Sequence, residues 1–428
     1  MEKSPTSSVT GTPRLILHGG AGNITRRNLG PEAWAQYRAA LLEILRSTND
    51  VLSNGSTALD AATHAVTLLE ANALFNAGHG AVFTRAGTNE LEASVMVSRG
   101  KRKRGCAVSL LRHVKHPILL AKEMLVRGEE DIVHGGGAYQ HGHLSGPEAE
   151  SLAAQWGLDL VEPGYFWTKK RWEDHLRGLE REKNGTGLPH WHPDMYVPQG
   201  TVGAVALDRY GTLCVATSTG GLTNKLPGRV GDTPTLGAGF WAEEWEVNLP
   251  APSSRAMLRR TMKTLLGDCF SVIRIRSSVP RREKRAAPPT RAVAMSGTGN
   301  GDSFLRLCAC HTTAAMARFS PGPRLPLRSA VTRVAGPGGE LQRSAGDRWG
   351  ETGEGEGGII GIEVSSNGQA EIVADFNCGG LFRTWIDHVG REHCMVFREE
   401  YELWREHMPT GLKKYLHWAV YRGENLIE

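Results

Sequence analysis

The sequence lacks any apolar run long enough to cross a membrane, although 40% of its 428 residues are hydrophobic. A membrane-spanning helix needs about 20 consecutive, mostly apolar residues, so we expect a soluble globular protein with no membrane partner. Residues 1–12 also lack the apolar core of a secretory signal. We expect this segment to be disordered.

The sequence also has little net charge and few cysteines. A formal charge of +5 gives no case for nucleic acid as a partner. Seven cysteines at irregular spacing are typical of reduced thiols rather than of a disulfide framework. We therefore expect a cytoplasmic protein.

Two stretches have the composition of insertions. Residues 247–291 contain a run of arginines and lysines with prolines, and residues 319–357 are rich in proline, glycine and arginine. A nucleic-acid or localisation role is one interpretation of the basic run. A solvated, partly disordered insertion fits the composition of both stretches better. Residues 395–428 carry aromatic side chains and predict a helical tail.

The apolar patterns between these stretches predict regular elements. Helices are expected at 31–49, 56–71, 117–127 and 147–156, strands at 90–96 and 107–111, and a hairpin at 357–374. A further strand at 15–18 ends in the glycine-rich segment 19–23. A phosphate-binding loop would need a Lys-Ser or Lys-Thr ending, which is missing, so we favour a packed turn near the functional site.

Thr201 stands between the charged, loop-like segment 169–200 and an apolar strand at 202–207. Taken alone, it is an ordinary first residue of a strand. Cleavage between Gly200 and Thr201 would instead give Thr201 a free α-amine beside its hydroxyl, so one residue would supply both nucleophile and base. An α-amine has a pKa of about 7.7–8.0, near the optimum for a base at neutral pH.

The residues after Thr201 extend this pattern. A turn at 208–211 predicts a hairpin whose second strand ends at Thr219, beside Thr201. The glycine-rich loop that follows carries Arg229 and Asp232, three residues apart. One cation and one anion on a loop are what an α-amino acid zwitterion needs, and a surface ion pair is the alternative.

A second glycine turn, at 297–301, lies between a predicted strand and a predicted helix at 303–318. Its spacing does not fit a dinucleotide-binding loop, whereas turn amides and the Thr298 hydroxyl suit an oxyanion hole. Histidines and cysteines near the linker and this helix do not have zinc-ligand spacing, and we interpret them as structural. They are His190, His192, Cys308, Cys310 and His311.

Together these segments resemble the plant-type asparaginase / isoaspartyl peptidase family of N-terminal-nucleophile hydrolases. The matching segments, in the family's order, are 17–22, 75–80, 200–208, 217–221, 228–232 and 298–301. The resemblance implies an α+β fold, a four-layer αββα sandwich, made as a precursor that cuts itself before Thr201. It divides the chain into subunits and flanking segments, namely an α subunit at 13–200 with the cleavable linker at about 169–200, a β subunit at 201–385 with insertions at 247–291 and 319–357, and a C-terminal extension at 386–428.

The resemblance also assigns roles to individual residues. Thr201 would be the nucleophile, and Thr219 would support its hydroxyl. Arg229 would bind the substrate α-carboxylate and Asp232 the α-ammonium group. Two residues of the second glycine turn would form the oxyanion hole and contact substrate, and a third would line the pocket, namely Thr298, Gly299 and Gly301.

The implied activity is hydrolysis of L-asparagine to L-aspartate and ammonia, or removal of isoaspartyl residues from peptides, through a β-aspartyl ester. No cofactor is required for this chemistry. The substrate is a small molecule or dipeptide, and two cleaved protomers are expected to pair. A structural sodium ion would bind mainly to backbone carbonyls of Leu69, Glu70, Asn72, Phe75, Ala77 and His79.

Alternatives stay open at this point. A glycosylasparaginase shares the implied core but needs a secretory route, and a protein-cleaving relative would not be expected to keep Asp232. An uncleaved, non-enzymatic protein that binds amino acids is the alternative from another class. The family commonly has an aspartate where this chain continues Val97-Ser98-Arg99, and the insertions put the usual pairing of protomers in doubt.

Overall fold

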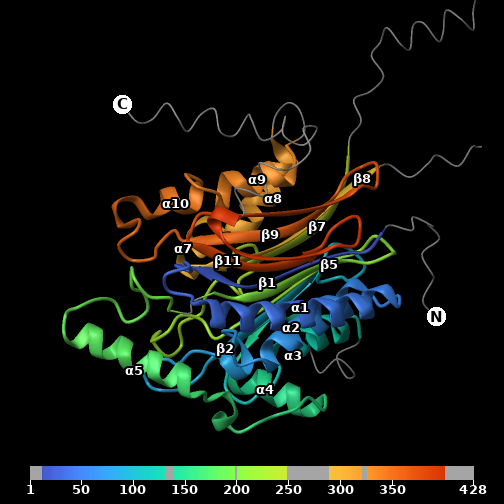
Figure 1. Cartoon of the computed structure of the whole chain (residues 1–428). Helices are drawn as coiled ribbons and strands as arrows, with labels where there is room; N and C mark the ends of the chain where they lie inside the picture. The colour runs from blue at the N-terminus through green and yellow to red at the C-terminus, as the bar shows by residue number, and fades with distance from the viewer. Residues whose placement is uncertain (1–11, 131–137, 198–199, 248–288, 321–324, 401–428) are drawn as a thin grey trace, which may run out of the picture.

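Two β-sheets stacked between two layers of helices make up the protein (Figure 1). The computed structural model describes residues 12–130, 138–197, 200–247, 289–320 and 325–400. Our expectations for residues 1–11, for most of 247–291 and for the tail beyond residue 400 lie outside the described residues.

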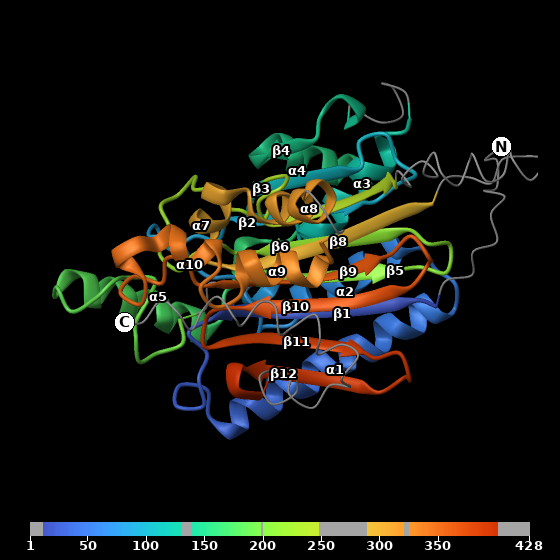
Figure 2. The same ribbon diagram turned by 90° about the horizontal axis from the view of Figure 1, so that it is seen from above.

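The larger sheet places the strand that follows Thr201 near its centre. Its eight strands are, in spatial order, β12 (Glu392–Phe397), β11 (Gly380–Ile386), β1 (Arg14–Gly22), β5 (Val202–Leu207), β6 (Leu213–Thr219), β2 (Leu91–Val97), β3 (Gly105–Leu111) and β4 (His143–Ser145). Neighbours are antiparallel except β3 and β4. The predicted hairpin at 202–219 is confirmed as β5 and β6, and every residue of β5 is buried. Figure 2 shows β12 at one edge of this sheet and β4 toward the other.

The smaller sheet has four antiparallel strands. They are, in spatial order, β10 (Ala370–Phe376), β9 (Gly357–Val364), β8 (Thr290–Gly299) and β7 (Phe240–Glu246). The predicted hairpin at 357–374 is therefore confirmed as β9 and β10. The second glycine turn begins within the last three residues of β8, so the smaller sheet positions it.

Helices cover the outer face of each sheet (Figure 1). Those on the side of the larger sheet are α1 (Pro31–Ser53), α2 (Ala58–Ala71), α3 (Pro117–Arg127), α4 (Gly146–Gln155) and α5 (Lys169–Lys183). Those on the side of the smaller sheet are α7 (Gly301–Leu307), α8 (Ala309–Phe319), α9 (Leu327–Ala335) and α10 (Glu340–Ala345). Short 3-10 helices are η1 (Gly78–Gly80), η2 (Ala138–Gln140), η3 (Pro163–Phe166) and η4 (Gly346–Arg348).

Local sequence explains why the first helices begin where they do. Pro31 occupies the first turn of α1, where its missing N–H costs no hydrogen bond. The Thr57 side chain caps α2 by accepting a hydrogen bond from the Asp60 amide. Since α2 packs beneath β5 and β6, this cap fixes the helix that supports the strand of Thr201.

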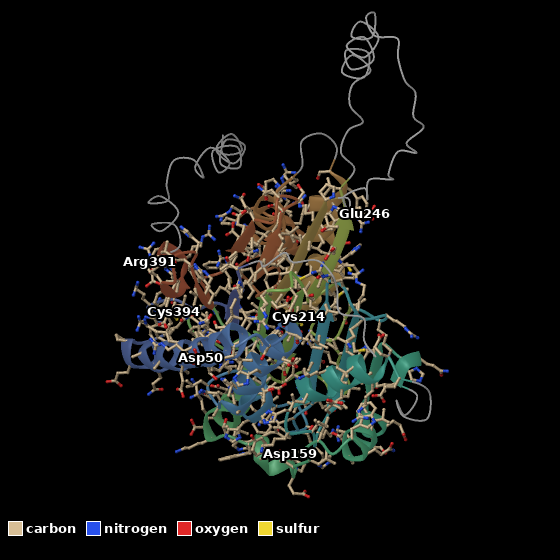
Figure 3. The ribbon with its side chains drawn as sticks, turned by 90° about the vertical axis from the view of Figure 1, so that its right-hand side faces the viewer. Asp50, Asp159, Cys214, Glu246, Arg391 and Cys394 are labelled. Atoms are coloured by element: carbon tan, nitrogen blue, oxygen red, sulfur yellow. The ribbon has the colours of Figure 1, made fainter. Side chains whose placement is uncertain are left out.

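Three hydrophobic cores separate the four layers. One lies between α1 to α3 and the larger sheet, a second between the two sheets, and a third between the smaller sheet and α8 and α9. The described chain is thus arranged helix, sheet, sheet, helix, as the αββα prediction requires. Cys214, on β6, lies in the middle of this arrangement, whereas Asp50, Asp159 and Arg391 mark its periphery (Figure 3). Within the described ranges, no helix combines the length and apolar character needed to cross a bilayer.

The prediction of a loop-like linker across 169–200 is wrong for its first half. Residues 169–183 form α5, whose start is capped by Thr168. The fully buried Arg171 side chain holds the helix in place by donating to the carbonyls of Gly80, at 2.8 Å, and Leu74, at 2.7 Å. The sequence signal was missed because α5 is anchored by buried hydrogen bonds of a charged side chain rather than by an apolar stripe.

The prediction of a solvated insertion at 319–357 is also wrong for the described residues 325–357. They include α9 and α10, and the apolar face of α9 is buried in the third core through Leu327, Ala330, Val331 and Val334. The abundance of arginine, glycine and proline hid this face.

The single helix predicted at 303–318 is two helices, because Cys308 adopts a left-handed conformation with φ of 48°. The tail contributes a strand, β12, before residue 398.

A buried ion pair ties α8 and α9 to the smaller sheet. Arg291 on β8 and Glu363 on β9 are both nearly inaccessible and lie 2.5 Å apart. Arg291 also donates to the carbonyls of Ala317 and Leu325, and Glu363 accepts the backbone amide of Leu327. The ends of α8 and α9 are therefore both fixed by this pair.

We expect Glu363→Ala to lower the free energy of unfolding by about 3–5 kcal/mol, because it leaves the Arg291 guanidinium buried without its counter-ion. Glu340→Ala is the matched control, since its partner Arg343 is exposed, and it should cost less than about 1 kcal/mol. Urea unfolding of both variants measures the difference. Equal losses would show that the Arg291–Glu363 pair does not hold the ends of α8 and α9.

Candidate active site

Thr201 lies at the start of β5 and is 3% exposed. Its hydroxyl oxygen is 2.7 Å from the hydroxyl oxygen of Thr233. Thr233 is fully buried, and its carbonyl accepts a hydrogen bond from Ser94 on β2. Sequence reasoning missed Thr233, because the motif that carries Arg229 and Asp232 was taken to end at Asp232. The structure makes Thr233 the partner of the candidate nucleophile.

Thr219 lies where the hairpin places it but has a different partner. Val202 pairs with Ser218, so the same antiparallel register puts Thr219 opposite Thr201. The Thr219 hydroxyl accepts the amide of Gly221 at 2.9 Å. Within the described residues, the side chain bonded to the Thr201 hydroxyl is that of Thr233, whereas Thr219 shapes the adjoining turn.

The second glycine turn, at the end of β8, reaches the backbone of Thr201. The Thr298 hydroxyl donates to the Thr201 carbonyl at 3.0 Å and accepts the Ala21 amide at 3.2 Å. Gly299 has φ of 144°, and a Cβ there would collide with Gly357 on β9. The turn needs glycine at this position, and it brings Thr298 next to the proposed cleavage point.

The first glycine turn, segment 19–23, packs against the peptide between Gly200 and Thr201. Gly20 has φ of 115°, and a Cβ on Gly200 would lie 2.5 Å from the amide nitrogen of Ala21. Segment 19–23 is therefore a packed turn near the site, as predicted. Only a residue without a side chain fits at position 200, so the peptide between Gly200 and Thr201 is held between two turns.

Arg229 and Asp232 meet around Gly301, the first residue of α7. A Cβ on Gly301 would lie 2.5 Å from Asp232 Oδ1 and 2.8 Å from an Arg229 guanidinium nitrogen. The structure thus brings together the three residues that the sequence assigned to substrate binding. Arg229 also pairs with the exposed Asp302 at 3.1 Å.

Both charged groups have unused hydrogen-bonding capacity. Arg229 Nε and Asp232 Oδ2 are buried without hydrogen-bond partners. Burial raises the pKa of Asp232 to about 7, and the Arg229 charge partly opposes that rise. Buried polar atoms are normally paired, so these two atoms point to a ligand that carries both an anion and a cation.

A buried network that sequence reasoning missed supports this loop. Glu92 on β2 is fully buried and accepts the Gly231 amide at 3.1 Å. Lys225 lies 3.9 Å from Glu92 and donates to the Glu90 carbonyl at 2.8 Å. Burial lowers the pKa of Lys225. No motif could have marked these residues, because their proximity arises only when β2 and the loop pack together.

His18 and Ser296 lie between the sheets behind Thr201. His18 Nε2 is 2.7 Å from the Ser296 hydroxyl, and a Cβ on Gly203 would collide with both side chains. Burial lowers the pKa of His18 to about 3, so the imidazole is neutral at physiological pH. The part of the chain that the structure describes holds no cluster of three or more His, Cys, Asp or Glu side chains suited to a metal ion.

The loop predicted to bind sodium turns back on itself. Gly78 lies against the backbone carbonyl of Glu70, and Gly80 against the carbonyls of Ala73 and Phe75. The Glu70 carboxyl group accepts the Ile118 amide at 3.0 Å and lies 3.4 Å from His116. The backbone carbonyl of Glu70, in contrast, faces the loop at Gly78. The carbonyls of Leu69, Asn72 and Ala77 accept backbone amides within the loop. Carbonyl oxygens are ligands that suit a hard cation.

This combination of fold and site defines a class of protein. A helix-sheet-sheet-helix fold, with a buried threonine at the start of a central strand and a threonine hydroxyl of the facing sheet bonded to its carbonyl, is that of the N-terminal-nucleophile hydrolases.

The chain belongs to the asparaginase family, whose family model, described as Asparaginase, matches residues 11–249. It is 34% identical over 374 residues to the isoaspartyl peptidase of Salmonella typhimurium, covering 87% of this chain and 94% of that protein. It is also 34% identical over 373 residues to the Escherichia coli isoaspartyl peptidase, covering 87% and 92%. The plant-type L-asparaginase of Pyrobaculum calidifontis is 37% identical over 231 residues, covering 54% and 70%.

The raised pKa of Asp232 makes stability depend on pH. The native state binds the Asp232 proton more tightly than the unfolded state, so this contribution is present at low pH and is lost as pH rises toward about 7. Asp232→Asn removes the titration. We expect the unfolding free energy of the wild type, relative to this variant, to fall by roughly 2 kcal/mol between pH 5 and pH 8. Thermal unfolding of the full chain at both pH values measures this, and a pH-independent difference would contradict it.

Proposed function

We propose that the protein is a self-cleaving threonine amidohydrolase. It hydrolyses L-asparagine to L-aspartate and ammonia and removes β-aspartyl residues from isoaspartyl peptides. The observation that carries the proposal is the buried Thr201 hydroxyl, which is bonded to Thr233 and lies beside Thr298. The names of the relatives and the unpaired atoms of Arg229 and Asp232 support it.

Self-cleavage uses the peptide that the two glycine turns hold. The Thr201 hydroxyl attacks the Gly200 carbonyl carbon, the C–N bond to Thr201 breaks, and the chain passes to the hydroxyl oxygen as an ester. Water then hydrolyses the ester, leaving a carboxylate on Gly200 and a free α-amine and hydroxyl on Thr201. The ordered backbone supplies the reactive geometry.

The same hydroxyl then attacks the substrate. Arg229 binds the α-carboxylate and Asp232 the α-ammonium group, which places the side-chain amide at Thr201. The α-amine of Thr201 takes the hydroxyl proton and delivers it to the leaving nitrogen. The Thr298 hydroxyl and the Gly299 amide stabilise the oxyanion, a contribution commonly of two to three powers of ten in rate. Water then hydrolyses the β-aspartyl ester and restores Thr201.

Three supporting features extend the proposal. The carbonyls of the loop at Leu69, Glu70, Asn72, Phe75, Ala77 and His79 hold a sodium ion that stabilises the fold and takes no part in the chemistry. Two cleaved protomers pair. The protein works in the cytoplasm, which suits the unpaired state of the six described cysteines.

Thr201→Ala is the main test. We expect purified Thr201→Ala to remain one chain, whereas the wild type splits into residues 1–200 and 201–428 and hydrolyses asparagine. Thr201→Ser, which keeps a hydroxyl, should still be cut. Intact-mass measurement and ammonia release report the two steps. An uncut wild type would favour an amino-acid-binding protein without activity. A cut wild type that is active only on glycosylasparagine would favour a glycosylasparaginase.

Thr233 gives a second prediction. Thr233→Val keeps the shape of the side chain but removes the hydrogen bond to Thr201, so self-cleavage should slow about three- to tenfold, the equivalent of one neutral hydrogen bond. Thr233→Ser should restore most of the rate. A cleavage time course followed by mass spectrometry measures both, and an unchanged rate in Thr233→Val would remove Thr233 from the site.

A further inference from the structure

Two glutamates, Glu90 and Glu92, flank Leu91 at the start of β2. Neighbouring side chains of a strand point to opposite faces of the sheet. Leu91 is buried in the core between the larger sheet and α1 to α3, so both glutamates point to the other face. There their carboxyl groups meet residues 225–232, which we call the substrate loop because it carries the two charged residues of the site.

The substrate loop is tied to these carboxyl groups on both sides of Arg229. The Gly228 amide donates to Glu90 Oε2 at 2.8 Å, and the Gly231 amide donates to Glu92 Oε1 at 3.1 Å. The first of these bonds is made by the residue directly before Arg229, and the second by the residue two positions after it. The main chain that carries the guanidinium group is therefore fixed from both directions.

The hydrogen bond to Glu90 also fixes the turn from which Arg229 emerges. The Arg229 amide donates to the Leu226 carbonyl at 3.1 Å, which closes a turn with Pro227 and Gly228 at its centre. Gly228 has φ of 86°, and a proline followed by a residue of positive φ is typical of a type II turn. The Gly228 amide takes no part in the closing bond, so its acceptor comes from outside the turn, and that acceptor is Glu90.

Glu90 is itself held in place as a buried anion. Its side chain is 3% exposed, and Arg112 Nη2 lies 2.7 Å from Oε1, which leaves Oε2 to the Gly228 amide. Burial opposes ionisation, but the hydrogen bonds from Arg112 and Gly228, with the nearby positive charges, bring the pKa of Glu90 below its usual value. An ionised acceptor forms a stronger hydrogen bond than a neutral one. Arg112 thus keeps Glu90 ionised and oriented toward the loop.

We propose that Glu90 is a positioning residue for substrate binding, which acts through Gly228 on Arg229. The proposal rests on the proposed function, in which Arg229 binds the substrate α-carboxylate. Arg229 Nε is buried without a hydrogen-bond partner among the described residues, so the direction of this donor depends on where the main chain places it. Self-cleavage joins Thr201 to Gly200 and does not use Arg229. Loss of Glu90 therefore weakens substrate binding and spares self-cleavage.

The test compares Glu90→Ala with the wild type in a self-cleavage time course and in steady-state hydrolysis of L-asparagine. We expect the cleavage rate to stay within about twofold and KM to rise about tenfold, the equivalent of a weakened hydrogen bond to a charged group. The value of kcat should change less than about twofold, because the α-carboxylate is bound alike in the ground state and the transition state. Glu90→Gln keeps an oxygen that can accept the Gly228 amide, and it should restore most of the KM.

Glu243→Ala is the matched control. It removes a glutamate of β7 that is 6% exposed and lies 2.6 Å from the half-exposed Arg318, much as Glu90 pairs with Arg112, and it should leave KM unchanged.

Arg112→Ala decides the matter if Glu90→Ala does not fold, since it removes the partner of Glu90 from a half-exposed position. It should raise KM about two- to threefold without slowing self-cleavage. A wild-type KM in whichever variant folds, an equal rise in Glu243→Ala, or self-cleavage slowed in parallel with the rise in KM overturns the positioning role alone. A wild type that neither splits at Thr201 nor hydrolyses asparagine overturns the proposed function, so the two failures are distinct.

Discussion

The backbone around Gly200 and Thr201 is confined from both sheets, and the rest of the site depends on this confinement. The turn of β1 packs on Gly200 from one side, and Thr298, at the end of β8, holds the Thr201 carbonyl from the other. The larger sheet supplies one turn and the smaller sheet the other. The stacking of the two sheets therefore sets the geometry at the nucleophile, and the core between them serves the chemistry as well as stability.

Burial of opposite charges is the second constraint on the site. Glu92, Lys225, Arg229 and Asp232 all lie on or beside one loop, and all are largely withdrawn from water. Buried charges are costly unless they are paired or bound. Glu92 and Lys225 satisfy each other and the backbone, whereas Arg229 and Asp232 keep unpaired atoms. The loop is held rigid by the first pair and keeps the second available for a ligand.

Much of this arrangement could be predicted from sequence because its signals are local. The hairpin after Thr201 follows from two apolar strands around the turn at 208–211. Short motifs in order single out Arg229, Asp232 and Thr298, which the structure places at the site. Thr233 and Glu92 could not be found in this way, since their roles depend on contacts across strands. The helix α5 was missed because buried hydrogen bonds of Arg171 hold it, and α9 because its apolar face lies within a segment of polar composition.

The strand order of the larger sheet has a consequence for the two fragments that a cut at Thr201 would produce. β1, from the first fragment, lies between β11 and β5 of the second, and β6 of the second lies beside β2 of the first. The polypeptides are interdigitated within one sheet, so neither can leave without dismantling its centre. Once both have unfolded, reassembly becomes a bimolecular encounter that depends on concentration. Scission would thus make the stability of the folded protein depend on the concentration of its two fragments, as the stability of a single chain does not.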